Sequence, residues 1–355
     1  MKVIEKYNDN LHNPFWKFQL GSCTYQVKDT PLRVDVIKKR LHEDIRYTFV
    51  KAKKFPEQLI SRLHPYHDYI KKTAASLKKP DEEFYPDLFP GDGARLRRRV
   101  DEPLWGGQWC TDAVTPITKK TYAVARASAE TALTGADLLL SGGERCVYAL
   151  CRPSGHHAGP RVFGGYCYFN NVATAAEFLA PHGKVAILDI DYHHGNGTQE
   201  FFEERKHVFT GSIHGDTAFE YPYFWGYTDE KGRGQGKGTN LNLPLPRGTR
   251  VPAYLKAVDR FCEATRAFRP DFLLVAAGFD THKTDPIGGF ALQIPDYQKI
   301  ALRLVALGVP TLVCQEGGYN TDVLGDCVHS LLSGFMDSKT ADAKSMPQAG
   351  CRRVP

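Results

Sequence analysis

The sequence has no apolar run long enough to cross a bilayer, and its first residues lack the apolar core of a signal peptide. Its nine cysteines are an odd number and include no Cys-x-x-Cys pair. These absences argue against a membrane protein and against a disulfide framework. We therefore expect reduced thiols and a cytoplasmic protein.

The chain also has little excess charge of either sign. The formal net charge is +6 for 355 residues, with basic clusters at residues 51–54 and 95–99. No zinc finger, helix-turn-helix or RNA-binding motif accompanies these clusters, so we expect a solvated or interfacial surface and no nucleic-acid partner. No linker-like stretch, composition break or internal repeat divides the chain. The sequence therefore predicts one domain over residues 1–355.

Short apolar runs alternate with segments of helical spacing. The sequence predicts buried strands at residues 145–150, 185–188, 208–213, 271–276 and 310–314. It predicts helical structure within residues 31–78, where the apolar residues of 59–70 share one helical spacing, and helices at residues 121–140, 252–268 and 296–307. Such alternation is typical of an α/β fold, in which helices cover both faces of an open, mostly parallel sheet.

Ionisable side chains follow two of the apolar runs. Asp189, Asp191, His193 and His194 come directly after residues 185–188, at the end of a strand where α/β proteins bind ligands. Asp191 and His193 are two residues apart, so on an extended chain they point to the same side. A solvated strand end would explain an isolated Asp-x-His, but four ionisable groups within six residues favour a metal site.

A catalytic zinc takes about three protein ligands and keeps one position open. The best candidate for the third ligand is Asp280, which follows the apolar run beginning at Phe272. Taken alone, Asp280 could be a helix N-cap or a turn residue. Its position after a second strand favours a ligand.

Two further stretches carry groups suited to carbonyl hydrolysis. His156 and His157 lie side by side in a glycine-bounded turn, where different environments can separate their pKa values for acid and base roles. Backbone carbonyls that satisfy a loop pair are the alternative. Tyr319 follows Gly317 and Gly318 after the run 310–314, so a tight turn would present its hydroxyl as a donor to an oxyanion.

These stretches occur in one order along the chain and resemble the zinc-dependent histone deacetylase superfamily. The matching blocks are residues 152–157, 163–171, 189–197, 277–280, 285–289 and 316–319. Within the superfamily the sequence is most similar to the bacterial acetylpolyamine amidohydrolases. That branch is supported by Asn196, by residues 212–216 and by the glycine-rich residues 226–242.

The resemblance implies an arginase/deacetylase-like fold and hydrolysis of an acetyl amide by a water that zinc activates. It implies that Asp191, His193 and Asp280 bind the metal, that His157 is the base, and that Tyr319 donates to the oxyanion. His156 would assist electrostatically, with Asp189 behind it and Asn196 behind His157. A structural K⁺ or Na⁺ is also implied. Its site would be formed by Asp189, Asp191, His193, Ser212 and Ile213.

The resemblance also implies residues that contact the substrate. Tyr166 and Tyr221 would line a narrow tunnel, although ordinary core packing is the alternative. Gly165 would carry the backbone past a site too tight for a side chain. Asp112 would meet the cationic part of the substrate at the rim, with a turn residue as an equal alternative.

Residues 80–113 have little periodicity and are too long for an ordinary connection. In the polyamine branch an insertion here narrows the active-site mouth and forms a homodimer, so a small cationic acetylated amine is the expected substrate. A protein acetyl-lysine deacetylase is the alternative with the same chemistry. An arginase-like ureohydrolase would require further Asp and His ligands for a second metal ion. A non-catalytic acyl-ligand binder would be expected to lack some of the catalytic residues, and here all of them are present. Residues 339–355 are expected to form a polar, frayed tail.

Overall fold

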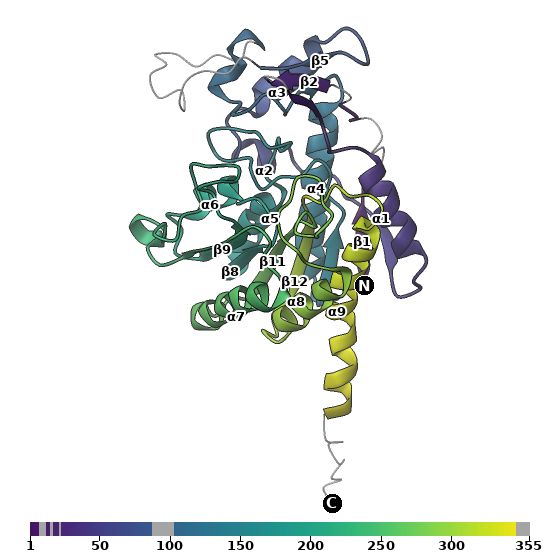
Figure 1. Ribbon diagram of the computed structural model, residues 1–355, viewed down its shortest axis with the longest axis vertical. Helices are drawn as coiled ribbons and strands as arrows, with labels where there is room; N and C mark the ends of the chain where they lie inside the picture. The colour runs from purple at the N-terminus through teal and green to yellow at the C-terminus, as the bar shows by residue number, and fades with distance from the viewer. Residues whose placement is uncertain (7–11, 15–16, 21–22, 87–102, 346–355) are drawn as a thin grey trace, which may run out of the picture.

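The computed structural model describes residues 1–6, 12–14, 17–20, 23–86 and 103–345. Its centre is an eight-stranded sheet with the order β10-β9-β8-β11-β12-β7-β1-β4, in which every pair is parallel (Figure 1). The strands are β1 (Lys2–Glu5), β4 (Thr48–Lys51), β7 (Cys146–Ala149), β8 (Val185–Asp189), β9 (Val208–Gly215), β10 (Asn240–Leu245), β11 (Phe272–Ala277) and β12 (Thr311–Gln315). The predicted α/β class is confirmed, while β1, β4 and β10 were not predicted from the sequence.

Helices cover both faces of the sheet because alternate strand residues point to opposite sides. Ala186 and Leu188 of β8 pack into one hydrophobic core, and Val185 and Ile187 pack into the other. The first core is completed by α1 (Leu32–His42), α7 (Val251–Phe268), α8 (Ile294–Val305) and α9 (Leu324–Ser345). The second is completed mainly by α4 (Thr121–Leu140) and α5 (Asn171–Leu179).

The helical structure expected within residues 31–78 is present, but the apolar spacing of residues 59–70 spans two helices. The structure has α2 (Gln58–Ser61) and then α3 (His67–Ser76), with Pro65 between them. Proline lacks the amide donor of a helix interior and disfavours helical backbone at the residue before it. The apolar spacing therefore continues across a break in the backbone.

The predicted insertion and tail are described only in part. Strand β5 (Glu83–Phe84) pairs with β6 (Ile117–Thr118), and η2 spans Pro103–Gln108, whereas residues 87–102 lie outside the described residues. Helix α9 continues to Ser345, so the first part of the expected tail is helical, and residues 346–355 lie outside the described part. A second small antiparallel pair joins β2 (Lys17–Leu20) to β3 (Cys23–Gln26).

The cysteines and the helices agree with the composition. All seven cysteines assessed within the described residues are buried and free of disulfides. None of the helices in the described ranges has the length and apolarity needed to span a membrane. Three short helices complete the fold: α6 (Asn196–Phe202), η3 (Ala180–His182) and η4 (Gly234–Gly236).

Candidate active site

Four neighbouring strands in the middle of the sheet deliver the candidate residues. In the order β8, β11, β12 and β7, the strands end level to within one residue, because Asp189 pairs with Ala276, Ala276 with Cys314, and Cys314 with Ala149. The segment after β8 carries Asp191 and His193, and the segment after β11 carries Asp280. Tyr319 follows β12, and the histidine pair follows β7. The candidate residues, which are spread over positions 156 to 319 of the sequence, therefore meet at one edge of the sheet, where α/β proteins bind ligands.

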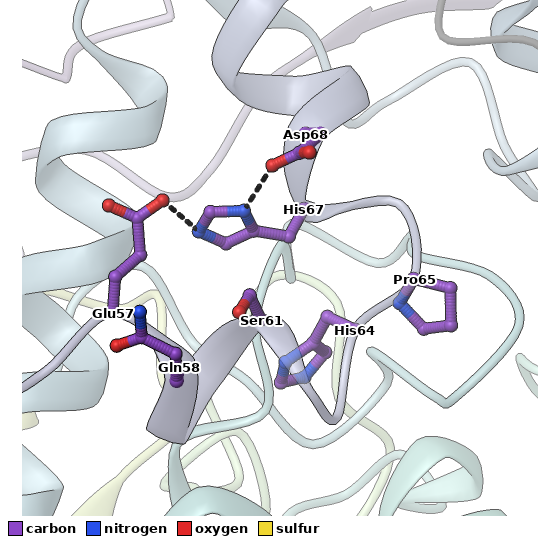
Figure 2. Close-up of a pocket in the computed structure, with 7 residues that line it drawn as sticks. All are labelled: Glu57, Gln58, Ser61, His64, Pro65, His67 and Asp68. Carbon is purple, nitrogen blue, oxygen red and sulfur yellow. Dashed lines mark hydrogen bonds and ion pairs between the residues drawn. The ribbon is translucent and has the colours of Figure 1, made fainter.

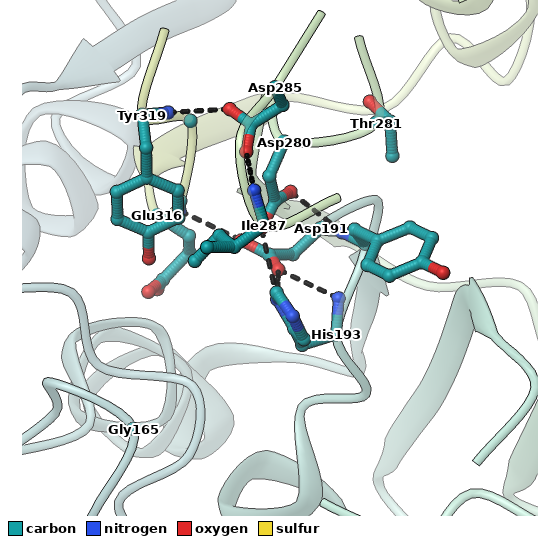
Figure 3. Close-up of polar contacts among 12 residues, drawn as sticks. Gly165, Asp191, His193, Asp280, Thr281, Asp285, Ile287, Glu316 and Tyr319 are labelled. Carbon is teal, nitrogen blue, oxygen red and sulfur yellow. Dashed lines mark hydrogen bonds and ion pairs between the residues drawn. The ribbon is translucent and has the colours of Figure 1, made fainter. Parts of the chain in front are cut away.

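Asp191, His193 and Asp280 converge and could hold a metal ion (Figure 3). One potential ligand atom from each lies within 4.8 Å of the others. His193 Nδ1 is 3.0 Å from Asp280 Oδ2 and 3.4 Å from Asp191 Oδ1. The other carboxylate oxygens accept backbone hydrogen bonds, with Tyr192 N at 2.8 Å from Asp280 Oδ1 and Gly317 N at 2.8 Å from Asp191 Oδ2. The backbone thus fixes both carboxylates before any ion binds.

The donor set fits a divalent zinc ion. Two carboxylate oxygens and one imidazole nitrogen are an ordinary zinc ligand set, and both carboxylates are fully buried. Burial, and then the negative charge of Asp191, raise the pKa of Asp280 to about 7. A divalent cation would remove this penalty, because it would compensate two buried carboxylates that share one imidazole. A Cβ on Gly317 would lie 2.5 Å from Asp191 Oδ2, so glycine is required for the backbone to approach this closely.

The histidine pair contains two rings with different partners. His156 Nδ1 is 2.9 Å from Asp189 Oδ2, and His157 Nδ1 is 2.8 Å from Asn196 Oδ1. Burial and the neighbouring His156 and His193 hold the pKa of His157 well below its usual value. Burial opposes protonation of His156 as well, but the carboxylates of Asp191 and Asp189 raise its pKa well above the usual range. The environments of the two rings therefore separate their pKa values, as expected for a charged and a neutral imidazole.

Tyr319 belongs to the loop that follows β12. Its backbone N donates to Asp285 Oδ2 at 2.7 Å, and burial keeps the pKa of its phenol well above the usual value, so the hydroxyl remains a donor. The ring of Tyr166 contacts the Tyr319 ring edge-on, with centroids 5.9 Å apart. Tyr319, the predicted oxyanion donor, is therefore in contact with Tyr166, which is predicted to line the substrate tunnel.

The loop with Gly165 and Tyr166 has an unusual backbone conformation that hydrogen bonds hold in place. Both residues have left-handed backbone, with φ of 60° and 66°, and a Cβ on Gly165 would lie 2.3 Å from His157 Cδ2. Such a conformation at a tyrosine costs about 1–3 kcal/mol and persists only where neighbours fix it. Here Asp112 accepts from Gly165 N, and Thr115 Oγ1 accepts from Tyr166 N at 3.0 Å. The sequence expectation of a backbone too tight for a side chain at Gly165 agrees with this geometry.

Both carboxylate oxygens of Asp112 accept hydrogen bonds from other residues of the protein. Besides Gly165 N, Asp112 accepts from Val114 N at 2.8 Å and from Thr115 Oγ1 at 2.9 Å, and the Tyr221 hydroxyl lies at 3.5 Å. Burial raises its pKa. Tyr221 packs edge-on against His157, with centroids 4.8 Å apart. These contacts indicate that Asp112 holds the loop of Gly165 and Tyr166 in place, and they argue against an open position at the rim.

The residues expected to bind K⁺ or Na⁺ are neighbours in the sheet. Ser212 on β9 pairs with Asp189 on β8, and Ile213 follows it. Ser212 Oγ is 2.8 Å from His214 Nδ1. The cation role of this group remains a prediction.

Arg33, which contacts the Tyr319 loop, was not predicted as a site residue. Its side chain is buried, its guanidinium lies 4.7 Å from the centroid of the Tyr319 ring, and its Nε donates to Gly318 O at 2.6 Å. Asp29 accepts from Arg33 at 2.5 Å and from Arg152 at 3.1 Å. The only signal in the sequence is that Arg33 falls on the apolar face of α1, next to Val34.

A hollow lies away from these residues, at α2 and the start of α3 (Figure 2). It has a volume of about 440 Å³, and the group Glu57, His67 and Asp68 could also hold an ion by spacing alone. The two carboxylates, however, contact opposite edges of the ring, with Glu57 at 3.5 Å from Nε2 and Asp68 at 3.0 Å from Nδ1. Glu57 is also paired with Lys71 at 2.8 Å and with Arg126 at 3.5 Å. This cluster is therefore a surface ion-pair network.

Comparisons with known proteins agree with the geometry. Residues 28–335 match the family described as the histone deacetylase domain. Acetylpolyamine amidohydrolase 1 of Pseudomonas aeruginosa is 38% identical, over 94% of this chain and 99% of its own. Acetylpolyamine amidohydrolase of Mycoplana ramosa is 44% identical, over 68% of this chain and 71% of its own. A crystal structure of acetylpolyamine aminohydrolase from Burkholderia pseudomallei superimposes with a TM-score of 0.86 at 31% identity, covering 94% and 98% of the two chains.

Proposed function

Because the chain belongs to the histone deacetylase family, we propose that it removes acetyl groups from acetylated polyamines or small acetylated diamines, with one zinc ion per chain. The observation that carries this proposal is the convergence of the buried Asp191 and Asp280 with the half-buried His193, beside the ring of His157 and the loop of Tyr319. The relatives that carry the name acetylpolyamine amidohydrolase support the choice of substrate.

Asp191, His193 and Asp280 would hold the zinc ion. When bound, zinc polarises the substrate carbonyl and lowers the pKa of water to about 7. The backbone amides of Tyr192 and Gly317 keep the two carboxylates in place. Little rearrangement is then needed when the ion binds.

His157 acts as the general base through a defined tautomer. The Asn196 oxygen accepts from Nδ1, so the proton of a neutral imidazole lies on Nδ1 and the lone pair lies on Nε2. Nε2 takes the proton from the attacking water and later returns it to the leaving amine. His156, held by the Asp189 carboxylate, is the charged partner that stabilises negative charge in the transition state.

Tyr319 donates a hydrogen bond from its phenolic hydroxyl to the developing oxyanion. The high pKa of the phenol keeps it protonated, and the Asp285 and Arg33 contacts orient its loop. Tyr166, Gly165 and Tyr221 surround the methylene chain of the substrate.

We also propose the remaining features implied by the resemblance. Asp189, Asp191, His193, Ser212 and Ile213 bind a structural K⁺ or Na⁺. The chain forms a homodimer in the cytoplasm through residues 80–113, which also narrow the mouth. Light scattering of the purified protein tests the dimer, and a monomer at micromolar concentration would contradict it.

The test of substrate class is a direct comparison of rates. The zinc-loaded protein is assayed with acetylputrescine, acetylcadaverine and an acetyl-lysine peptide. The expected result is a higher kcat/KM for the acetylated diamines. Faster turnover of the peptide would favour the protein deacetylase alternative, and no turnover of any acetyl amide would reject the proposed function.

A further inference from the structure

Glu316 lies where the two catalytic loops meet, yet the proposed chemistry gives it no role. It is the first residue of the Glu-Gly-Gly-Tyr stretch after β12, and its side chain is fully buried. A buried carboxylate is costly for a fold unless it is well satisfied by hydrogen bonds. The partners of this one are therefore informative.

The side chain of Glu316 holds the histidine loop. Its Oε2 accepts from Gly155 N at 2.7 Å and from His156 N at 3.3 Å. These two amides belong to the backbone of the loop that carries the side chains of His156 and His157. The other oxygen, Oε1, has no hydrogen-bond partner within the described residues.

The backbone of Glu316 holds the tyrosine loop. Its N donates to Ala277 O at 2.9 Å, at the end of β11 and three residues before Asp280. Its carbonyl oxygen accepts from Arg33 Nη2, and Gln315 Nε2 donates to it at 2.9 Å. Arg33 is the same residue whose guanidinium lies over the Tyr319 ring.

One residue thus connects the base, the oxyanion donor and a metal-ligand strand. We propose that Glu316 is a positioning residue, whose carboxylate holds the backbone of residues 155–156 at a fixed distance from the Tyr319 loop. His157 and Tyr319 then reach the same carbonyl group. This inference rests on the proposed function, because the alignment matters only if both residues act in one reaction.

The length of the side chain and its acceptor oxygen, and not its charge, carry the proposed effect. Glu316→Gln keeps both the length and an oxygen that accepts from the two amides. Glu316→Asp keeps the charge but is one methylene too short, and Glu316→Ala removes the acceptor. A displacement of about 1 Å in such a site can cost about 100-fold in rate.

The experiment measures kcat, KM and zinc content for the three variants, using the acetylated amine that the wild type hydrolyses fastest. We expect Glu316→Ala and Glu316→Asp to lose about 10- to 100-fold in kcat, with KM and zinc content little changed, and Glu316→Gln to stay within about threefold of wild type. Glu130→Ala is the matched control, because Glu130 is also buried but is bound by Lys54 and Arg126, which are not residues of the site. Its kcat should equal that of wild type.

Two outcomes would overturn the proposal: full activity in Glu316→Asp, or a Gln variant as slow as the Asp variant. If Glu316→Ala does not fold, the Asp and Gln pair still decides. In a Tyr319→Phe background the Asp substitution should cost less than about threefold, whereas a general structural defect would cost the same in both backgrounds.

Hydrogen exchange at the amides of Gly155 and His156 gives a readout that needs no activity. Exchange should be faster in Glu316→Asp than in Glu316→Gln. Equal exchange would overturn the positioning role, even if the wild type hydrolysed no acetyl amide and the proposed function had therefore failed.

Discussion

Two regions of this molecule place two carboxylates around one imidazole. In the first, Asp191 and Asp280 are fully buried and share the ring of His193. In the second, Glu57 and Asp68 lie on opposite edges of the His67 ring, and Lys71 and Arg126 already balance Glu57. Similar residue types therefore produce either a group that could hold a metal ion or an ion-pair network. Burial, the direction of the donor atoms and the local sum of charge decide which one forms.

The largest expected difference between the two regions is in bound metal. Asp280→Asn should lose zinc and fall to background turnover, a loss of about 1000-fold or more, because it removes a ligand charge. Glu57→Gln should keep the zinc content and the rate of wild type. Elemental analysis and kcat on the same preparations check both. Full zinc and rate in Asp280→Asn, or zinc loss in Glu57→Gln, would reverse the assignment.

The two regions also differ in what their histidines do. His157→Ala should lower kcat by about 100- to 10,000-fold while one zinc per chain stays bound, because the base is removed and the ligands are not. His67→Ala is the matched control in the ion-pair network and should retain the wild-type kcat for the folded fraction. Retained activity in His157→Ala would remove that residue from the base role.

A smaller effect is expected for the oxyanion donor. Tyr319→Phe should lower kcat by about 100- to 1000-fold, with an unchanged circular dichroism spectrum, because only the phenolic donor is lost. Steady-state kinetics at saturating substrate measure the effect. An unchanged kcat would mean that another group donates to the oxyanion.

The smallest effect concerns stability in the ion-pair network. The hydrogen bond from Lys71 lowers the pKa of Glu57, so this pair stabilises the fold above the ordinary glutamate pKa of about 4.3 and ceases to do so as the pH falls through the lower folded value. Glu57→Gln should therefore lower the free energy of unfolding by less than about 1 kcal/mol at pH 7, and by a smaller amount as the pH falls below the ordinary glutamate pKa. Thermal melts at pH 7 and near pH 3 measure this. A difference that grows toward pH 3 would contradict it.

The sequence was sufficient to predict much of the site because its residues immediately follow apolar strands. Asp191, His193, Asp280 and Tyr319 each come within a few residues of such a strand, and parallel strands bring their carboxyl ends to one edge. The sheet order itself was not predictable, since it depends on packing between segments far apart in the chain.

Other features could not be predicted because their partners are distant. Arg33 reaches Gly318 across 285 positions, and a lone arginine on a helix face gives no sign of that contact. Asp112 was expected at the rim on resemblance, while its hydrogen bonds to Gly165 and Thr115 depend on the strained loop around Tyr166. The helix break at Pro65 was missed because apolar spacing outweighed the proline.

The residues proposed to bind the metal follow two adjacent strands, and this has a thermodynamic consequence. An ion held by the segments after β8 and β11 is released when those strands separate, so ion binding and unfolding are linked equilibria. Each tenfold rise in free zinc above its dissociation constant then adds about 1.4 kcal/mol to the stability of the native state. Metal supply in the cell would thereby influence how long the protein survives proteolysis, in addition to how fast it works.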